Sequence, residues 1–70
     1  MLHSYFIVSM RRSPTNSDTD IKLFRARSKN EVYIYCIVNK KPIVYMDETT
    51  EGVFNDADTS ARIELMINTR

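Results

Sequence analysis

The side chains that most often carry out chemistry in proteins are scarce in this sequence. His3 is the only histidine and Cys36 the only cysteine. A catalytic triad needs a histidine that a third group orients, whereas His3 lies at a chain end, where residues are commonly frayed. One histidine and one thiol also cannot assemble the ligand set of a zinc site. We therefore expect no catalytic residues, no metal site and no cofactor, and a protein that is not an enzyme.

The carboxylates do not form a recognisable site either. The adjacent Asp47 and Glu48, and the acidic run that starts at Asp56, lie in polar sequence, where solvated turn residues are the ordinary interpretation. The run DADTSA resembles the opening of a calcium loop, but Ala61 stands where such a loop needs glycine and Ile67 where it needs glutamate. The single glycine in the chain also rules out a glycine-rich phosphate loop.

The surroundings of Cys36 indicate a structural residue and a reducing compartment. The neighbours in IYCIV are apolar, and no His, Lys or Arg lies beside the thiol in sequence to lower its pKa. A single cysteine cannot form an internal disulfide, and chains without disulfides are typical of the cytoplasm. No apolar run approaches the roughly 20 residues that span a bilayer, and MLHSYFIVSMRRS has the wrong order for a signal peptide. We therefore expect a cytoplasmic protein that does not bind membranes.

The near-zero net charge conceals a split along the chain. Residues 1–46 carry eight basic and three acidic side chains, whereas residues 47–70 carry two basic and six acidic ones. This split suits two complementary surfaces of a self-associating protein, or a basic binding face. Most of the aromatic residues share the basic half, a combination that single-stranded nucleic-acid binders use. In that second interpretation the nucleic-acid contacts are Arg25, Arg27, Lys40, Lys41, Tyr33 and Tyr35.

Residues 31–48, EVYIYCIVNKKPIVYMDE, are apolar on both faces if they form two strands. One face would suffice for the core of so small a chain, so the other remains for a partner. Tyrosine and methionine are enriched in protein interfaces. The residues that we expect in such an interface are Tyr33, Tyr35, Ile37, Val44 and Met46.

The patterning predicts a single small domain, residues 1–70, with four antiparallel strands in sequence order. The expected strands cover residues 2–11, 20–28, 31–38 and 43–48. Polar residues 12–19 form the first loop. A turn at Asn39–Pro42 pairs Val38 with Ile43, and Cys36 with Tyr45, in the last hairpin. The short connections give an antiparallel meander.

The remaining third of the chain sets the fold class. Acidic residues 47–60 read as irregular, with Val53 and Phe54 tucked inward. Residues 61–70 fit an amphipathic helix capped by Asp58, Thr59 or Ser60, because Ala, Arg, Glu, Leu and Met favour helices. We therefore expect an α+β fold, a four-stranded antiparallel meander with a C-terminal amphipathic helix. The alternative is a small all-β barrel in which the C-terminal segment is a strand.

These observations together favour a protein that works by binding. A chain of 70 residues is marginal on its own and commonly gains stability by self-association. We expect a non-enzymatic interaction protein of the accessory, inhibitor or adaptor type, such as phages and mobile elements encode. It would bind a protein partner and form a homo-oligomer. The alternative is a single-stranded nucleic-acid-binding module that uses a basic, tyrosine-rich sheet face.

Overall fold

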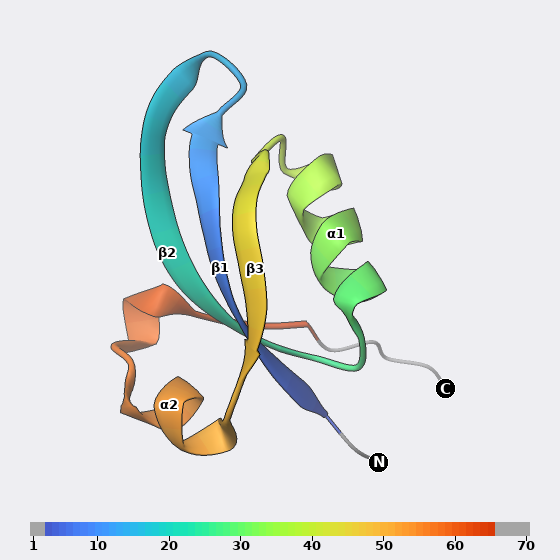
Figure 1. Cartoon of the computed structure of the whole chain (residues 1–70), viewed down its shortest axis with the longest axis vertical. Coiled ribbons are helices and arrows are strands. Elements are labelled where there is room, and N and C mark those ends of the chain that lie inside the picture. Colours follow the sequence, from blue (N-terminus) through green and yellow to red (C-terminus); the bar gives the residue numbers. More distant parts are fainter. Residues whose placement is uncertain (1–2, 66–70) are drawn as a thin grey trace.

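The computed structural model of the chain describes residues 3–65. Four strands form one sheet in the order β3-β1-β2-β4, and two helices accompany it (Figure 1). The elements in chain order are β1 (Ser4–Ser13), β2 (Asn16–Ala26), α1 (Lys29–Val38), β3 (Ile43–Thr49), α2 (Glu51–Asp56), a 3₁₀ turn (Thr59–Ala61) and β4 (Arg62–Glu64). The α+β class and the four-stranded sheet are confirmed. The sheet is mixed and open, because β4 runs parallel to β2 and does not meet β3. The closed barrel of the alternative is therefore wrong, whereas its C-terminal strand occurs over Arg62–Glu64.

The long hairpin of β1 and β2 forms the centre of the sheet. Its register pairs Phe6 with Phe24 and Ser13 with Asn16, leaving a two-residue turn. The polar composition of residues 12–19 predicts an irregular loop, whereas the ladder continues through most of that segment. Contacts between polar side chains support this exposed end of the hairpin, including an ion pair at 3.2 Å from Arg12 to Asp20. Polar composition here marks an extension of the hairpin beyond the core.

Residues 31–38 form most of helix α1, so the prediction of a third strand there is wrong. The side chains that face the sheet are Val32, Tyr35 and Cys36, at the i, i+3, i+4 spacing of a helix. The β-branched and aromatic residues of this segment favour strands. Tertiary packing overrides that preference, because the apolar face of the hairpin needs a cover and α1 provides it.

The C-terminal end of α1 closes in a Schellman motif. The backbone N–H of Lys41 donates to the carbonyl of Cys36 at 2.8 Å, and that of Lys40 donates to the carbonyl of Ile37 at 3.1 Å. Lys40 adopts a left-handed conformation with φ of 58°, where glycine is the commoner residue. This motif places two lysines, expected in a hairpin turn, at the end of a helix.

Strand β3 pairs with β1, and the predicted pairing with residues 31–38 does not occur. The register places Tyr45 opposite Ser9 and Met46 opposite Val8. The predicted pairs of Val38 with Ile43, and of Cys36 with Tyr45, are therefore wrong. The chain crosses from β2 through α1 to reach the far side of β1.

The core lies between α1 and one face of the sheet. Its fully buried members come from β1, β2 and α1, namely Phe6, Val8, Met10, Phe24, Ala26, Val32 and Cys36. The ring of Tyr35 meets Phe24 edge-on, with centroids 5.4 Å apart. Because α1 contributes two of these buried side chains, its rotation about its own axis is defined by the core.

The segment after β3 confirms one expected anchor and corrects the other. Phe54 in α2 is buried on the sheet face opposite α1, with its ring 5.4 Å from that of Tyr5. The neighbouring Val53 is 47% exposed, so its predicted inward position is wrong. The side-chain hydroxyl oxygen of Thr50 caps α2 by accepting from the backbone N–H of Val53 at 3.3 Å.

The predicted C-terminal helix over residues 61–70 is also wrong where the structure describes it. Arg62–Glu64 form β4, which pairs in parallel with β2 and places Ile63 beside Phe24. The N–H of Leu65 continues this pairing by donating to the carbonyl of Arg25 at 2.9 Å. Backbone pairing with an open sheet edge therefore outweighs helix propensity here. Residues 66–70 of the predicted helix lie outside the described residues.

Candidate protein-binding surface

The five residues expected in a protein interface do not share one face. Tyr33 and Ile37 point outward from α1, and Val44 is exposed on β3. Tyr35 and Met46 are partly buried and pack against the core. The predicted interface therefore divides into an exposed part on α1, an exposed residue on β3, and two residues that support the core.

The exposed part belongs to a larger apolar stripe on α1. We call it the α1 outer face, and it consists of Tyr33, Ile34, Ile37 and Val38. Their side chains are 45%, 59%, 74% and 70% exposed, respectively. The spacing i, i+1, i+4, i+5 places them side by side along the helix, on the side away from the buried Val32 and Cys36. Within the described residues, no other part of the chain buries this stripe.

The strand interpretation misses Ile34 and Val38 because it applies the wrong period. A period of two assigns both residues to the strand face that also holds Val32 and Cys36, and hence to the core. In a helix, Ile34 and Val38 lie on a different side from Val32 and Cys36, and they are left in solvent. Applying the 3.6-residue period to the same letters would have found the complete stripe.

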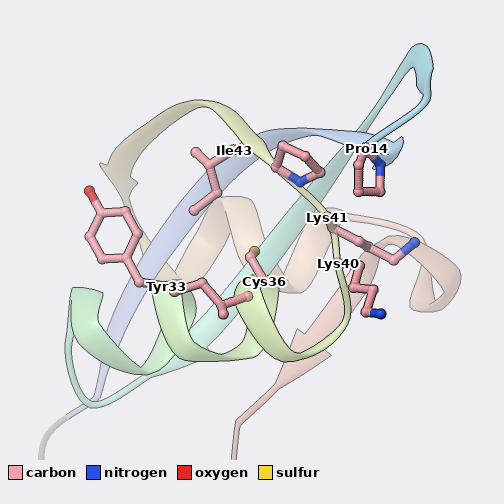
Figure 2. A pocket seen from close by; sticks show the side chains of 8 residues that line it. Pro14, Tyr33, Cys36, Lys40, Lys41 and Ile43 are labelled. Carbon is pink, nitrogen blue, oxygen red and sulfur yellow. The ribbon is translucent and has the colours of Figure 1, made fainter.

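A pocket of about 410 Å³ lies beside the C-terminal end of α1 (Figure 2). It forms where this helix end meets the hairpin turn and the start of β3. Its lining residues are Pro14, Tyr33, Cys36, Ile37, Lys40, Lys41, Pro42 and Ile43. Two of these, Tyr33 and Ile37, also belong to the α1 outer face, so the pocket and the stripe form one continuous surface.

The pocket combines an apolar lining with positive charge at one end. Lys40 and Lys41 lie together at that end, and Tyr33 lies at the other (Figure 2). The ammonium group of Lys41 donates to the carbonyl of Arg12 at 3.2 Å. No acidic residue is among the described residues that line the pocket. The pocket therefore suits a ligand group with an apolar body and a negative charge.

The chemistry of Cys36 does not make the pocket a catalytic site. Burial raises the pKa of this thiol, and the positive charge of Lys41 offsets only part of that increase. The thiol is therefore protonated at neutral pH, whereas a nucleophilic cysteine needs a thiolate. Cys36 acts here as a small apolar residue in the core.

The six residues of the nucleic-acid interpretation are spread over several surfaces. Arg25 lies on the sheet face opposite α1, and its guanidinium pairs with Glu64 at 3.1 Å. Arg27 precedes α1, whereas Lys40 and Lys41 follow it at the far end of the helix. Of the two tyrosines, Tyr35 packs against the core, and only Tyr33 accompanies the lysines. The predicted basic, tyrosine-rich sheet face is therefore not assembled.

The sheet face opposite α1 exposes a second, smaller apolar group. Ile21 and Tyr45 flank Ser9 on neighbouring strands and are 59% and 56% exposed. The hydroxyl of Tyr45 donates to a carboxylate oxygen of Asp47 at 3.0 Å. This hydrogen bond, with the charge of Asp47, raises the pKa of Tyr45. Since this group lies on the opposite face from α1, Ile21 offers a matched control for changes to the α1 outer face.

A second hollow, lined by Phe54, Thr59, Arg62 and Glu64, has its polar groups already engaged. The guanidinium of Arg62 lies 5.7 Å from the centre of the Phe54 ring and donates to Thr59 at 3.1 Å. Glu64 pairs with Arg25. This hollow is consequently a structural contact between β4 and α2.

Comparisons with known protein families, with curated proteins and with solved structures find no match for this chain. In the part of the chain that the structure describes, no helix has the length and apolar character that crossing a membrane requires. Among the same residues, no three His, Cys, Asp or Glu side chains cluster as a metal site would need.

Proposed function

We propose that this protein is a non-enzymatic interaction module that binds a protein partner through the α1 outer face and the adjoining pocket. The observation that carries the proposal is the run of four large apolar side chains that α1 leaves 45% to 74% exposed. Burying one such side chain completely contributes about 1.5–3 kcal/mol. Covering what remains exposed on all four therefore contributes roughly 4–7 kcal/mol before the costs of association are subtracted.

Charge around α1 indicates the chemistry of the partner. Arg27 and Lys29 flank the start of the helix, and Lys40 and Lys41 flank its end. Glu31 is the only acidic residue between them, and its carboxylate already accepts from the backbone N–H of Arg27 at 2.8 Å. An apolar stripe between two basic ends is complementary to an amphipathic segment with acidic flanks. We assign such a segment of a partner protein to this surface.

The test is affinity capture with variants on opposite faces of the molecule. The tagged chain, its Ile37→Asp variant and its Ile21→Asp variant would each be incubated with host lysate, with and without nuclease. Ile37 lies in the α1 outer face, whereas Ile21, exposed to 59%, lies across the sheet. We expect one protein to be retained by the wild type and by Ile21→Asp, to be lost with Ile37→Asp, and to survive nuclease.

Cross-linking and mass spectrometry of the captured complex would then map the bound segment. A segment with apolar residues at helical spacing and acidic neighbours supports the proposal. Equal capture by both variants would overturn it, and so would material that disappears with nuclease. The latter result would favour the nucleic-acid-binding alternative, and capture of the chain by itself would favour self-association.

A further inference from the structure

We infer that the pocket beside the C-terminal end of α1 takes one large apolar side chain of the partner together with a neighbouring carboxylate. This inference rests on the proposed function and names the residue chemistry that the partner must present. The carboxylate comes either from an Asp or Glu next to the apolar residue, or from the partner's own C-terminus. The two sources share one chemistry and can be separated by experiment.

The apolar part of the pocket is pre-formed. Cys36 is 3% exposed and belongs to the core, and Ile43 packs against that core. Pro14 and Pro42 contribute rings whose backbone φ is fixed. A wall of core residues and prolines loses little conformational freedom when a ligand binds. The volume of about 410 Å³ falls within the usual range of ligand pockets and leaves room for a large side chain with its backbone.

The charged end of the pocket supplies the second half of the recognition. Lys40 is exposed and follows the last turn of α1, where the Schellman motif holds its backbone. Lys41 uses one donor for the carbonyl of Arg12 and keeps two further N–H groups for a ligand. Ion pairs near solvent are weak. The carboxylate should therefore strengthen binding by about three- to tenfold, with the apolar side chain providing the rest.

Continuity with the α1 outer face indicates that the occupant is part of a protein. Tyr33 and Ile37 line the pocket and also form the stripe. A segment that covers Ile34 and Val38 therefore passes the pocket mouth and can insert a side chain there. A large side chain buried in a well-packed pocket is typical of the residues that dominate interface energies.

The test uses the full ¹⁵N-labelled chain and small probes followed by NMR. The probes are N-acetyl-phenylalanine, its uncharged amide, N-acetyl-aspartyl-phenylalaninamide and N-acetyl-alanine. We expect N-acetyl-phenylalanine or the aspartyl peptide to shift the amides of Cys36, Ile37 and Ile43, with a Kd near 1 mM, as expected for a ligand of this size. The uncharged amide should bind about three- to tenfold more weakly. N-acetyl-alanine should cause no shift at these amides.

The two carboxylate probes distinguish the sources. Tighter binding of N-acetyl-phenylalanine indicates a C-terminal residue, and tighter binding of the aspartyl peptide indicates an internal acidic neighbour. In a Lys40→Gln/Lys41→Gln variant, the charged and uncharged probes should bind equally. Lys22→Gln, on β2 and outside the pocket lining, should keep the preference for the carboxylate. Thermal unfolding of each variant checks that the fold is intact.

Three results would overturn the inference: equal binding of the acid and its amide to the wild type, shifts that map away from the pocket, or no shifts at about 20 mM probe. If any of these occurs while capture of the partner still depends on Ile37, the α1 outer face remains the binding surface. In that case only the assignment of the pocket fails.

Discussion

The exposures of two valines distinguish helix α1 from a strand formed by the same residues. In a strand over residues 31–38, Val32 and Val38 would point to the same face. In α1, Val32 is 0% exposed and Val38 is 70% exposed. The same substitution, valine to alanine, should therefore have very different effects at the two positions.

The expected magnitudes follow from burial. At Val32 the loss of two methyl groups removes about 1.6 kcal/mol of transfer free energy. An incompletely filled cavity adds about 1 kcal/mol, and the higher helix propensity of alanine returns about 0.5 kcal/mol. The free energy of unfolding should fall by about 2 kcal/mol. At Val38 only about a third of the transfer free energy is lost, and helix propensity offsets it, so the change should lie within about 0.5 kcal/mol.

Urea unfolding followed by circular dichroism measures both changes. A chain of this size has a total stability of roughly 3.5–10 kcal/mol and a denaturant slope of about 1 kcal/mol/M. The midpoint should therefore move by about 2 M for Val32→Ala and by less than about 0.5 M for Val38→Ala. Equal losses at the two positions would refute the helical assignment, and with it the α1 outer face.

Three further predictions concern other parts of the fold. Phe54→Ala should lower the free energy of unfolding by about 3 kcal/mol or more, since the ring is buried against Tyr5; a smaller loss in the same urea assay would show that α2 is not anchored there. Asp47→Asn should lower the pKa of Tyr45, because the hydrogen bond and charge of Asp47 raise it. Ultraviolet titration of tyrosinate in the two proteins measures this difference in pKa. In the wild type, the stability that the Tyr45–Asp47 hydrogen bond contributes should be present below the pKa of Tyr45 in the unfolded chain. It should be lost as pH rises through the pKa of Tyr45 in the folded protein. The Cys36 thiol should react slowly with a disulfide reagent in the folded protein and much faster in urea, because burial keeps it protonated and covered; a fast reaction without urea would contradict its position.

The parts of the fold that could be predicted are those where one pattern excludes its competitors. Val8 stands in the apolar run YFIV and Phe24 in the expected strand over residues 20–28, and both lie in the core of the central hairpin. Phe54 is an isolated aromatic residue in an acidic segment, and it is buried as expected. In each case burial of a large apolar side chain decides the position, and the residue type shows that preference directly.

The stretch over residues 31–38 could not be assigned because it is apolar at nearly every position. A period of two and a period of 3.6 then fit equally well, and the β-branched composition favours the wrong one. What decides between them is the cover that the hairpin face requires, which depends on contacts between distant segments. The strand at Arg62–Glu64 could not be predicted for the same reason. Its pairing with β2 is a long-range contact, and helix propensity takes no account of such contacts.

The candidate binding surface could also be predicted only in part. Tyr33 and Ile37 were expected at an interface and are exposed, whereas Ile34 and Val38 were missed with the helix itself. The pocket could not be predicted, because it joins the hairpin turn at Pro14 to residues 33–43, which are distant in sequence and were expected to form two strands. Self-association stays a prediction that sedimentation of the purified chain over a range of concentrations would test.

The most direct measurement of the central claim is the affinity of the captured partner for three purified proteins, the wild type, Ile37→Asp and Ile21→Asp, by calorimetry. A charge in the α1 outer face should weaken binding at least tenfold, as the loss of a central interface side chain does. The matched charge on the opposite sheet face should leave the Kd unchanged. Equal affinities for the two variants, or a loss confined to Ile21→Asp, would contradict the assignment of the binding surface to α1.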